Sequence, residues 1–111
     1  TDVDAPGVLR VELRRLADRV GARLRESGWE AATVSIKVRF SDFSTVTRAQ
    51  TLPEPTSVGQ RIGAAAIDLF ELLDRRLPIR LIGVRAEKLR SSGAASPMLW
   101  DDDEGWRRVE G

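Results

Sequence analysis

One eight-residue stretch restricts the fold more than any other part of the chain. From Thr33 to Phe40, polar and apolar residues alternate strictly, and the apolar members are Val34, Ile36, Val38 and Phe40. Because successive side chains of a strand point to opposite faces, this period predicts a half-buried strand. Its apolar side needs a covering layer from elsewhere in the chain. The sequence therefore predicts a two-layer protein built on a sheet with one polar face.

Two helical stripes supply the covering layer. Asp4 followed by Pro6 is typical of a helix start, and Gly28 of its end. The apolar stripe between them is Leu9, Leu13, Leu16, Ala17, Val20 and Leu24. Ser57 with Gln60 predicts a capping box for a second helix. Its stripe is Ile62, Ala65, Ala66, Leu69, Phe70 and Leu73. Both stripes have the spacing of amphipathic helices that cover a sheet.

Two further strands complete the expected fold. Residues 44–52 are rich in Thr and Val and predict a hairpin partner that Pro53 and Pro55 bring to an end. Residues 79–86 predict another short strand. The order is helix, strand, strand, helix, strand. We therefore expect an α+β fold with two helices packed on one face of a small antiparallel sheet.

Composition divides the chain into a domain and a tail. With 111 residues, 41% of them hydrophobic, the chain is expected to form one small domain at residues 1–90. Residues 91–97 have the composition of a flexible linker, which opens an acidic tail at residues 91–111. That tail carries two arginines and five acidic residues, a net charge of −3. Because the whole chain has a net charge of +1, residues 1–90 carry a net charge of +4. No apolar run is long enough to cross a membrane, and we expect a cytoplasmic protein.

The polar side of the sheet is the candidate binding surface. Lys37 and Arg39 share it with Ser35, and Thr45, Thr47 and Thr51 have the matching parity in the next strand. Arg85 alternates away from Ile82 and Val84 and joins them, whereas Arg48 has the opposite parity and reaches this side only at a bulge or from the strand end. Hydroxyls and cations of this kind hold phosphate oxygens. The alternative is an ordinary solvated sheet face.

The hairpin also carries a family resemblance. Residues 33–53, TVSIKVRFSDFSTVTRAQTLP, together with Ile82-Gly83-Val84, resemble the little finger, or polymerase-associated, domain of Y-family translesion DNA polymerases of the bacterial DNA polymerase IV (DinB) type. The similarity covers about residues 5–90. In that family the domain lays its sheet in the major groove and grips the backbones of the primer-template duplex. The resemblance therefore implies a role in translesion synthesis and DNA repair.

Carried over residue by residue, the resemblance names a set of DNA contacts. Its members are Lys37, Arg39, Thr47, Arg48 and Arg85, and Thr45 joins them from the strand parity. Gln50 stands where the family commonly has a second Arg, and Leu81 occupies a position that is basic in some members, so the grip is expected to be weaker at these two points. The family's fold begins with a strand before the first helix, and this chain starts after it. The gap is filled by the tail, by a neighbouring copy or by nothing, and an unpaired edge predicts self-association.

The tail holds a candidate partner site. Y-family bacterial polymerases carry a sliding-clamp-binding peptide beyond the little finger, and Met98, Leu99 and Trp100 stand in the corresponding place without the leading Gln. These residues are expected either to dock the clamp or to pack on the domain's own surface. The acidic run from Asp101 to Glu104 is typical of solvated chain rather than a metal site.

No catalytic constellation is present in the sequence. Cysteine and histidine are absent, which excludes disulfides and the usual zinc sites. In the resembling family, polymerase chemistry needs paired carboxylates and magnesium in the palm domain. We therefore expect no cofactor in this fragment and magnesium in the parent protein. Two functions are expected: non-catalytic binding of the duplex DNA backbone or, alternatively, a protein interaction module that docks the sliding clamp or another repair factor.

Overall fold

Two helices and an antiparallel sheet make up the part of the chain that the computed structural model describes, residues 6–74, 77–92 and 109–110. The elements in chain order are α1 Pro6–Ser27, β1 Trp29–Phe40, β2 Thr45–Thr56, α2 Gly59–Glu71, β3 Ile79–Ser91 and β4 Val109–Glu110. The predicted order of helix, strand, strand, helix, strand is confirmed. The two-residue strand β4 adds to it.

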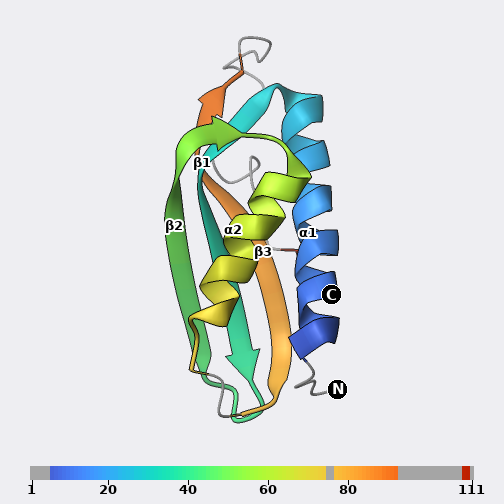
Figure 1. Ribbon diagram of the computed structural model, residues 1–111, viewed down its shortest axis with the longest axis vertical. Coiled ribbons are helices and arrows are strands. Elements are labelled where there is room, and N and C mark those ends of the chain that lie inside the picture. Colours follow the sequence, from blue (N-terminus) through green and yellow to red (C-terminus); the bar gives the residue numbers. More distant parts are fainter. Residues whose placement is uncertain (1–5, 75–76, 93–108, 111) are drawn as a thin grey trace.

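The sheet has the strand order β2-β1-β3-β4, with every pair antiparallel. Figure 1 shows both helices on one side of the sheet, and α2 crosses in front of it beside α1. Helix α1 packs mainly against α2 and β3, whereas α2 packs against β1 and β2. The α+β fold expected from the sequence is therefore confirmed, and the opposite face of the sheet carries neither helix.

The core lies between the helix layer and the sheet. The apolar stripes of both helices meet the apolar side of the predicted strand there. Fully buried members include Leu13, Leu16, Leu24, Val34, Ile36, Val38, Ile62 and Phe70. Burying one such side chain contributes about 1.5–3 kcal/mol to folding. The alternation of residues 33–40 therefore decides which face of the sheet remains polar.

The helices approach each other closely at two glycines. A Cβ added at Gly21 of α1 would lie 2.8 Å from the backbone N of Gly59, at the start of α2, and 2.8 Å from the carbonyl O of Ser57. A Cβ added at Gly59 would lie 2.8 Å from Cα of Asp18. Real Cβ atoms do not approach backbone this closely, because the atoms would overlap. Glycine is therefore required at both positions for this packing.

The capping box predicted for α2 is wrong. The N-cap residue is Val58, and no side chain caps the helix. The backbone N–H of Val58 donates instead to Oγ1 of Thr56 at 3.0 Å, and Arg25 donates to the carbonyl O of Ser57 at 2.6 Å. The contact of Gly59 with α1 places the helix start one residue later than the sequence signature indicates, and Ser57 is left outside the helix.

The predicted end of the second strand is also wrong. Strand β2 continues through both prolines to Thr56. The register shifts between Ala31 and Thr33 of β1, so that β2 resumes pairing beyond the prolines, with Ala31 opposite Thr56. Proline lacks an N–H donor but is tolerated on edge strands and at bulges. Because β2 lies at one edge of the sheet, both conditions hold here.

Strand β3 is longer than predicted and partly covered at its outer edge. It extends to Ser91, beyond the expected end at Ala86, and pairs with β1 throughout. On its other side, Gly83 and Val84 pair with Glu110 and Val109 of β4. The sequence left three alternatives for the position of the family's missing first strand: the tail, a neighbouring copy or nothing. In the described residues it is the tail that pairs with β3, over two residues.

Candidate nucleic-acid interface

The face of the sheet that points away from α1 and α2 is here called the outer face. In β1 it comprises Thr33, Ser35, Lys37 and Arg39. In β2 it comprises Thr45, Thr47, Ala49 and Thr51, and in β3 Leu81, Gly83, Arg85 and Glu87. This assignment follows from the strand register, because residues directly opposite each other in an antiparallel pair point to the same face.

Four predicted site residues meet at the turn end of the outer face. Lys37 lies opposite Thr47, and Arg39 lies opposite Thr45. The Nε–H of Arg39 donates to Oγ1 of Thr45 at 3.1 Å. Both threonines are exposed, and both cations are half-exposed. The structure therefore brings two cations and two hydroxyls together on one solvent-facing surface.

Arg85 joins the same face from the next strand. It lies opposite Ser35, and Gly83 next to it lies opposite Lys37. The three cations come from two neighbouring strands, about 4.8 Å apart. Lys37, Arg39 and Arg85 therefore share one surface, as the sequence predicts.

The sequence predicts that Ser35 displays its hydroxyl to solvent, and this prediction is wrong. Ser35 is completely buried, and its Oγ–H donates to Oε2 of Glu87 at 3.1 Å. Thr33 is also buried, with its Oγ1 3.3 Å from Oγ1 of Thr51. A buried hydroxyl needs a partner, and both find theirs in the neighbouring strands. The hydroxyls of this half of the outer face are therefore already engaged within the protein.

Arg48 lies on the other face of the sheet. It is opposite Ile36, and the register of β1 and β2 is regular at this position. No bulge turns it toward Lys37 and Arg39. Its side chain is exposed at the edge strand, where Nη1 donates to the carbonyl O of Thr47 at 2.9 Å. The placement of Arg48 among the outer-face contacts is therefore not supported by its geometry.

The sequence interpretation missed two charged residues beside the predicted cations. Glu87 lies one residue beyond Ala86, where the sequence pattern predicts the end of the strand. Arg80 lies at a register shift between β1 and β3, and its guanidinium Cζ lies 4.5 Å from the centroid of the Phe43 ring. The position of Glu87 follows from the full length of β3, and that of Arg80 from the register shift. No short sequence pattern indicates either position.

The turn between β1 and β2 is held by a carboxylate. Oδ1 of Asp42 accepts hydrogen bonds from the backbone N–H of Ser44 at 2.9 Å and from its hydroxyl at 2.6 Å. These two hydrogen bonds lower the pKa of Asp42 below its ordinary value, and the bond from the Ser44 hydroxyl has the larger effect. Phe43 in the same turn has a left-handed backbone with φ of 69° and is 62% exposed. The turn therefore presents an aromatic ring next to the cationic end of the outer face.

Several predicted features fall outside the described residues. Met98, Leu99 and Trp100 lie there, as do Asp4 and the acidic run from Asp101 to Glu104. Within residues 6–74, 77–92 and 109–110, no group of three or more acidic side chains is placed to hold a metal ion. Neither helix in the same part of the chain is long and apolar enough to span a bilayer.

Comparison with known proteins connects this geometry to a family. Residues 1–99 match the family model described as the impB/mucB/samB family C-terminal domain. The DNA polymerase IV of Streptomyces coelicolor is 45% identical over 85 residues, which cover 75% of this chain and 18% of that protein. The DNA polymerase IV of Methanoculleus marisnigri is 42% identical over 88 residues, covering 79% of this chain and 24% of that protein.

A third relative extends the match further along this chain. The DNA polymerase IV of Streptococcus mutans is 36% identical over 96 residues, which cover 86% of this chain and 26% of that protein. The chain thus spans about a quarter or less of the length of these three relatives. The family model and the relatives agree with the resemblance of residues 33–53. The chain therefore belongs to the impB/mucB/samB family, as a C-terminal domain of the Y-family DNA polymerases.

Proposed function

We propose that this chain is a non-catalytic domain that binds the backbone of primer-template duplex DNA through its outer face. The observation that carries the proposal is the gathering of Lys37, Arg39 and Arg85 with the hydroxyls of Thr45 and Thr47 on the sheet surface opposite the helices. Cations and hydroxyls of this kind contact phosphate oxygens without reading bases. A rigid sheet holds them at fixed spacing, so they can follow a regular backbone.

A titration with salt tests the proposal directly. We expect the chain to bind duplex DNA weakly, with a Kd on the order of 10⁻⁴ to 10⁻⁶ M. Each phosphate neutralised contributes about 0.9 to the slope of log K against log salt. A variant with Lys37, Arg39 and Arg85 replaced by Ala is expected to lower that slope by up to about 2.7. Fluorescence anisotropy of a labelled primer-template at several salt concentrations measures the slope.

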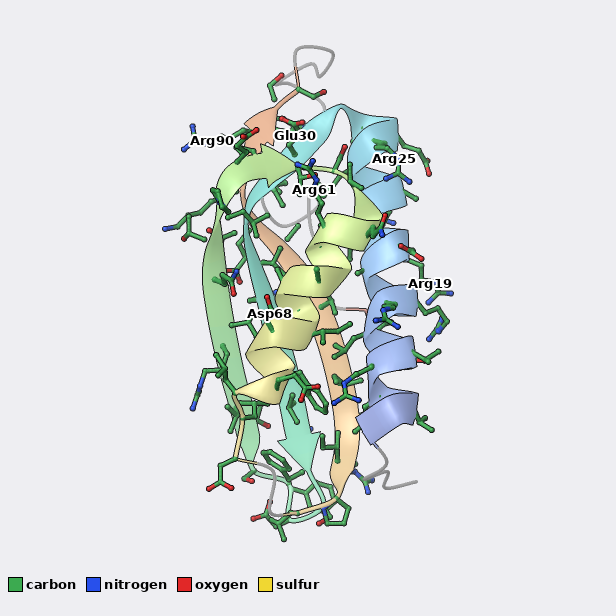
Figure 2. All side chains as sticks on the ribbon, viewed as in Figure 1. Arg19, Arg25, Glu30, Arg61, Asp68 and Arg90 are labelled. Carbon is green, nitrogen blue, oxygen red and sulfur yellow. The ribbon has the colours of Figure 1, made fainter. Side chains whose placement is uncertain are left out.

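A matched variant separates the outer face from total charge. Arg14, Arg19 and Arg23 are exposed on α1, and replacing all three by Ala removes the same charge from the helix layer. Figure 2 shows Arg19 on that helix, away from the sheet. We expect the α1 variant to keep nearly the full salt slope. Equal losses in both variants would mean that general charge attraction, and not the outer face, holds the DNA.

We propose that the chemistry of the parent polymerase is carried by other parts of it. The chain matches a C-terminal domain and 18% to 26% of the length of three full-length relatives. On this proposal the carboxylates that hold magnesium lie outside the chain, which supplies grip on the duplex. The chain is then expected to extend no primer by itself with magnesium and nucleotides present. Any extension by a purified chain would contradict this.

The alternative function is docking to the sliding clamp. We propose it for Met98, Leu99 and Trp100, and its support is the sequence pattern of an apolar group that follows a linker. Deleting residues 96–100 is expected to abolish co-elution with the clamp and to leave DNA binding intact. Co-elution that survives the deletion would move the contact elsewhere.

Self-association is proposed at the outer edge of β3. Among the described residues, strand β4 pairs with Gly83 and Val84 of that strand, and a sheet edge with unpaired backbone groups attracts further strands. We expect the mass measured by sedimentation to rise with protein concentration. A constant monomer mass up to high concentration would contradict the proposal.

A further inference from the structure

The outer face is electrically uneven along its strands. Toward the β1–β2 turn it carries Lys37 and Arg39, with exposed threonines opposite them. Arg85 follows along the face, opposite Ser35. Toward the other end, Glu87 lies opposite Thr33. Among the twelve outer-face residues that the register of β1, β2 and β3 assigns, Glu87 is the one carboxylate. A surface proposed to meet phosphates thus carries a fixed negative charge on one half.

Glu87 is held in place by the sheet itself. Its Oε2 accepts a hydrogen bond from the hydroxyl of Ser35 at 3.1 Å, and Ser35 is completely buried. The side chain of Glu87 is half-buried. The hydrogen bond to a buried hydroxyl favours one position of the Glu87 side chain. Its carboxylate is therefore held on this part of the outer face.

The hydroxyls of Ser35 and Thr33 next to Glu87 are buried and engaged within the protein. Ser35 donates to Glu87, and Oγ1 of Thr33 lies 3.3 Å from Oγ1 of Thr51. Thr33 is buried with 4% of its surface exposed. At the turn end, by contrast, Thr47 is exposed opposite Lys37. Thr51 and Thr47 are four residues apart, about 13 Å along the strand. The two halves therefore differ both in charge and in available donors.

We propose that Glu87 sets the boundary of the DNA-binding surface. Its charge repels phosphates, and it thereby confines the duplex backbone to the part of the outer face between Arg85 and the β1–β2 turn, which holds Lys37, Arg39, Arg85, Thr45 and Thr47. Glu87 is thus a positioning residue that fixes where along the sheet the duplex lies. The inference rests on the proposed DNA binding by the outer face.

Neutralising Glu87 tests the boundary. Glu87→Gln removes the charge but keeps an oxygen that accepts the hydrogen bond from Ser35. We expect it to tighten binding to duplex DNA about three- to tenfold at low salt, with the gain shrinking as salt screens the charge. Asp68→Asn is the matched control, because it makes the same charge change on α2, where Figure 2 places Asp68. The control is expected to change the affinity less than about twofold.

The position of the duplex has its own readout. The chain contains no cysteine, so Thr47→Cys and Thr51→Cys each introduce a single thiol on the exposed side of β2. With Glu87 intact, we expect duplex DNA to slow alkylation of the Thr47→Cys variant and to leave the Thr51→Cys variant unaffected. Adding Glu87→Gln is expected to extend shielding to the thiol at position 51. Thermal melts followed by circular dichroism verify that each variant is folded.

The outcomes separate the boundary from the binding function. Equal shielding of both thiols with Glu87 intact, or a Glu87→Gln affinity no tighter than that of Asp68→Asn, would overturn the boundary while DNA binding by the outer face stands. If neither thiol is shielded and replacing Lys37, Arg39 and Arg85 leaves the affinity unchanged, the proposed function fails and the boundary fails with it.

Discussion

Adding a single methyl group at Gly21 tests how closely the two helices must pack. In Gly21→Ala the new Cβ would lie 2.8 Å from the N of Gly59, 2.8 Å from the carbonyl O of Ser57 and 2.9 Å from the Cα of Gly59. All three atoms belong to the backbone. No side-chain rotation can relieve the overlap, and the start of α2 has to move away from α1.

The expected cost follows from two opposing effects. Alanine in a helix interior is more stable than glycine by about 1 kcal/mol. Overpacking a tight interior costs about 1–3 kcal/mol, and three backbone contacts place Gly21→Ala at the upper end of that range. We therefore expect a net loss of about 1–2 kcal/mol in the free energy of unfolding. For a domain of this size, such a loss lowers Tm by about 5–15 °C.

Thermal and urea unfolding followed by circular dichroism measure the effect. Gly7→Ala is the matched control, because it lies in the same helix and a Cβ there meets nothing within 4 Å. The control is expected to leave Tm unchanged or slightly higher. A Gly21→Ala chain as stable as the control would refute the reasoning, since it would show that the helix layer shifts at little cost.

Three other substitutions probe the core and the β1–β2 turn. Phe70 is fully buried, and Phe70→Ala should lower the urea-derived free energy of unfolding by about 3–5 kcal/mol; a loss below about 1 kcal/mol would contradict its place in the core. Asp42 has a pKa lowered by Ser44, so its contribution is complete above pH about 4 and disappears as pH falls through the lower folded pKa. The Tm difference between wild type and Asp42→Ala should therefore close in acid, and a constant difference would argue against the charge. Phe43 has φ of 69°, and Phe43→Gly should relieve about 1–2 kcal/mol of backbone strain while losing about 0.5–1 kcal/mol from the Arg80 contact. A small rise in Tm is expected, and a large fall would give the ring a structural role.

The layers of the fold were predictable because each follows from a local period. The alternation of residues 33–40 and the two helical stripes agree with one arrangement, and the structure has it. The ends of the helices and strands were harder to predict, because they depend on contacts between segments that are distant in the sequence. The prolines of β2 are accommodated by a register shift against β1, and Gly59 sets the start of α2 by its contact with α1. Neither effect is visible in a local window of sequence.

The candidate site was predictable to the extent that strand parity decides it. Parity alone placed Lys37, Arg39 and Arg85 on one face, and it correctly set Arg48 apart, which the family resemblance did not. Burial along a strand is not given by parity. Ser35 therefore looked like a surface hydroxyl, although it is enclosed and bonded to a carboxylate that lay beyond the predicted strand end.

The path of β2 through Pro53 and Pro55 also limits how copies of the domain can join. These positions lack amide hydrogens, so an incoming strand alongside them would find carbonyl acceptors without matching donors. Sideways growth of the sheet is thereby discouraged at this margin. Any assembly built by strand pairing is thereby directed to the opposite margin, next to β4.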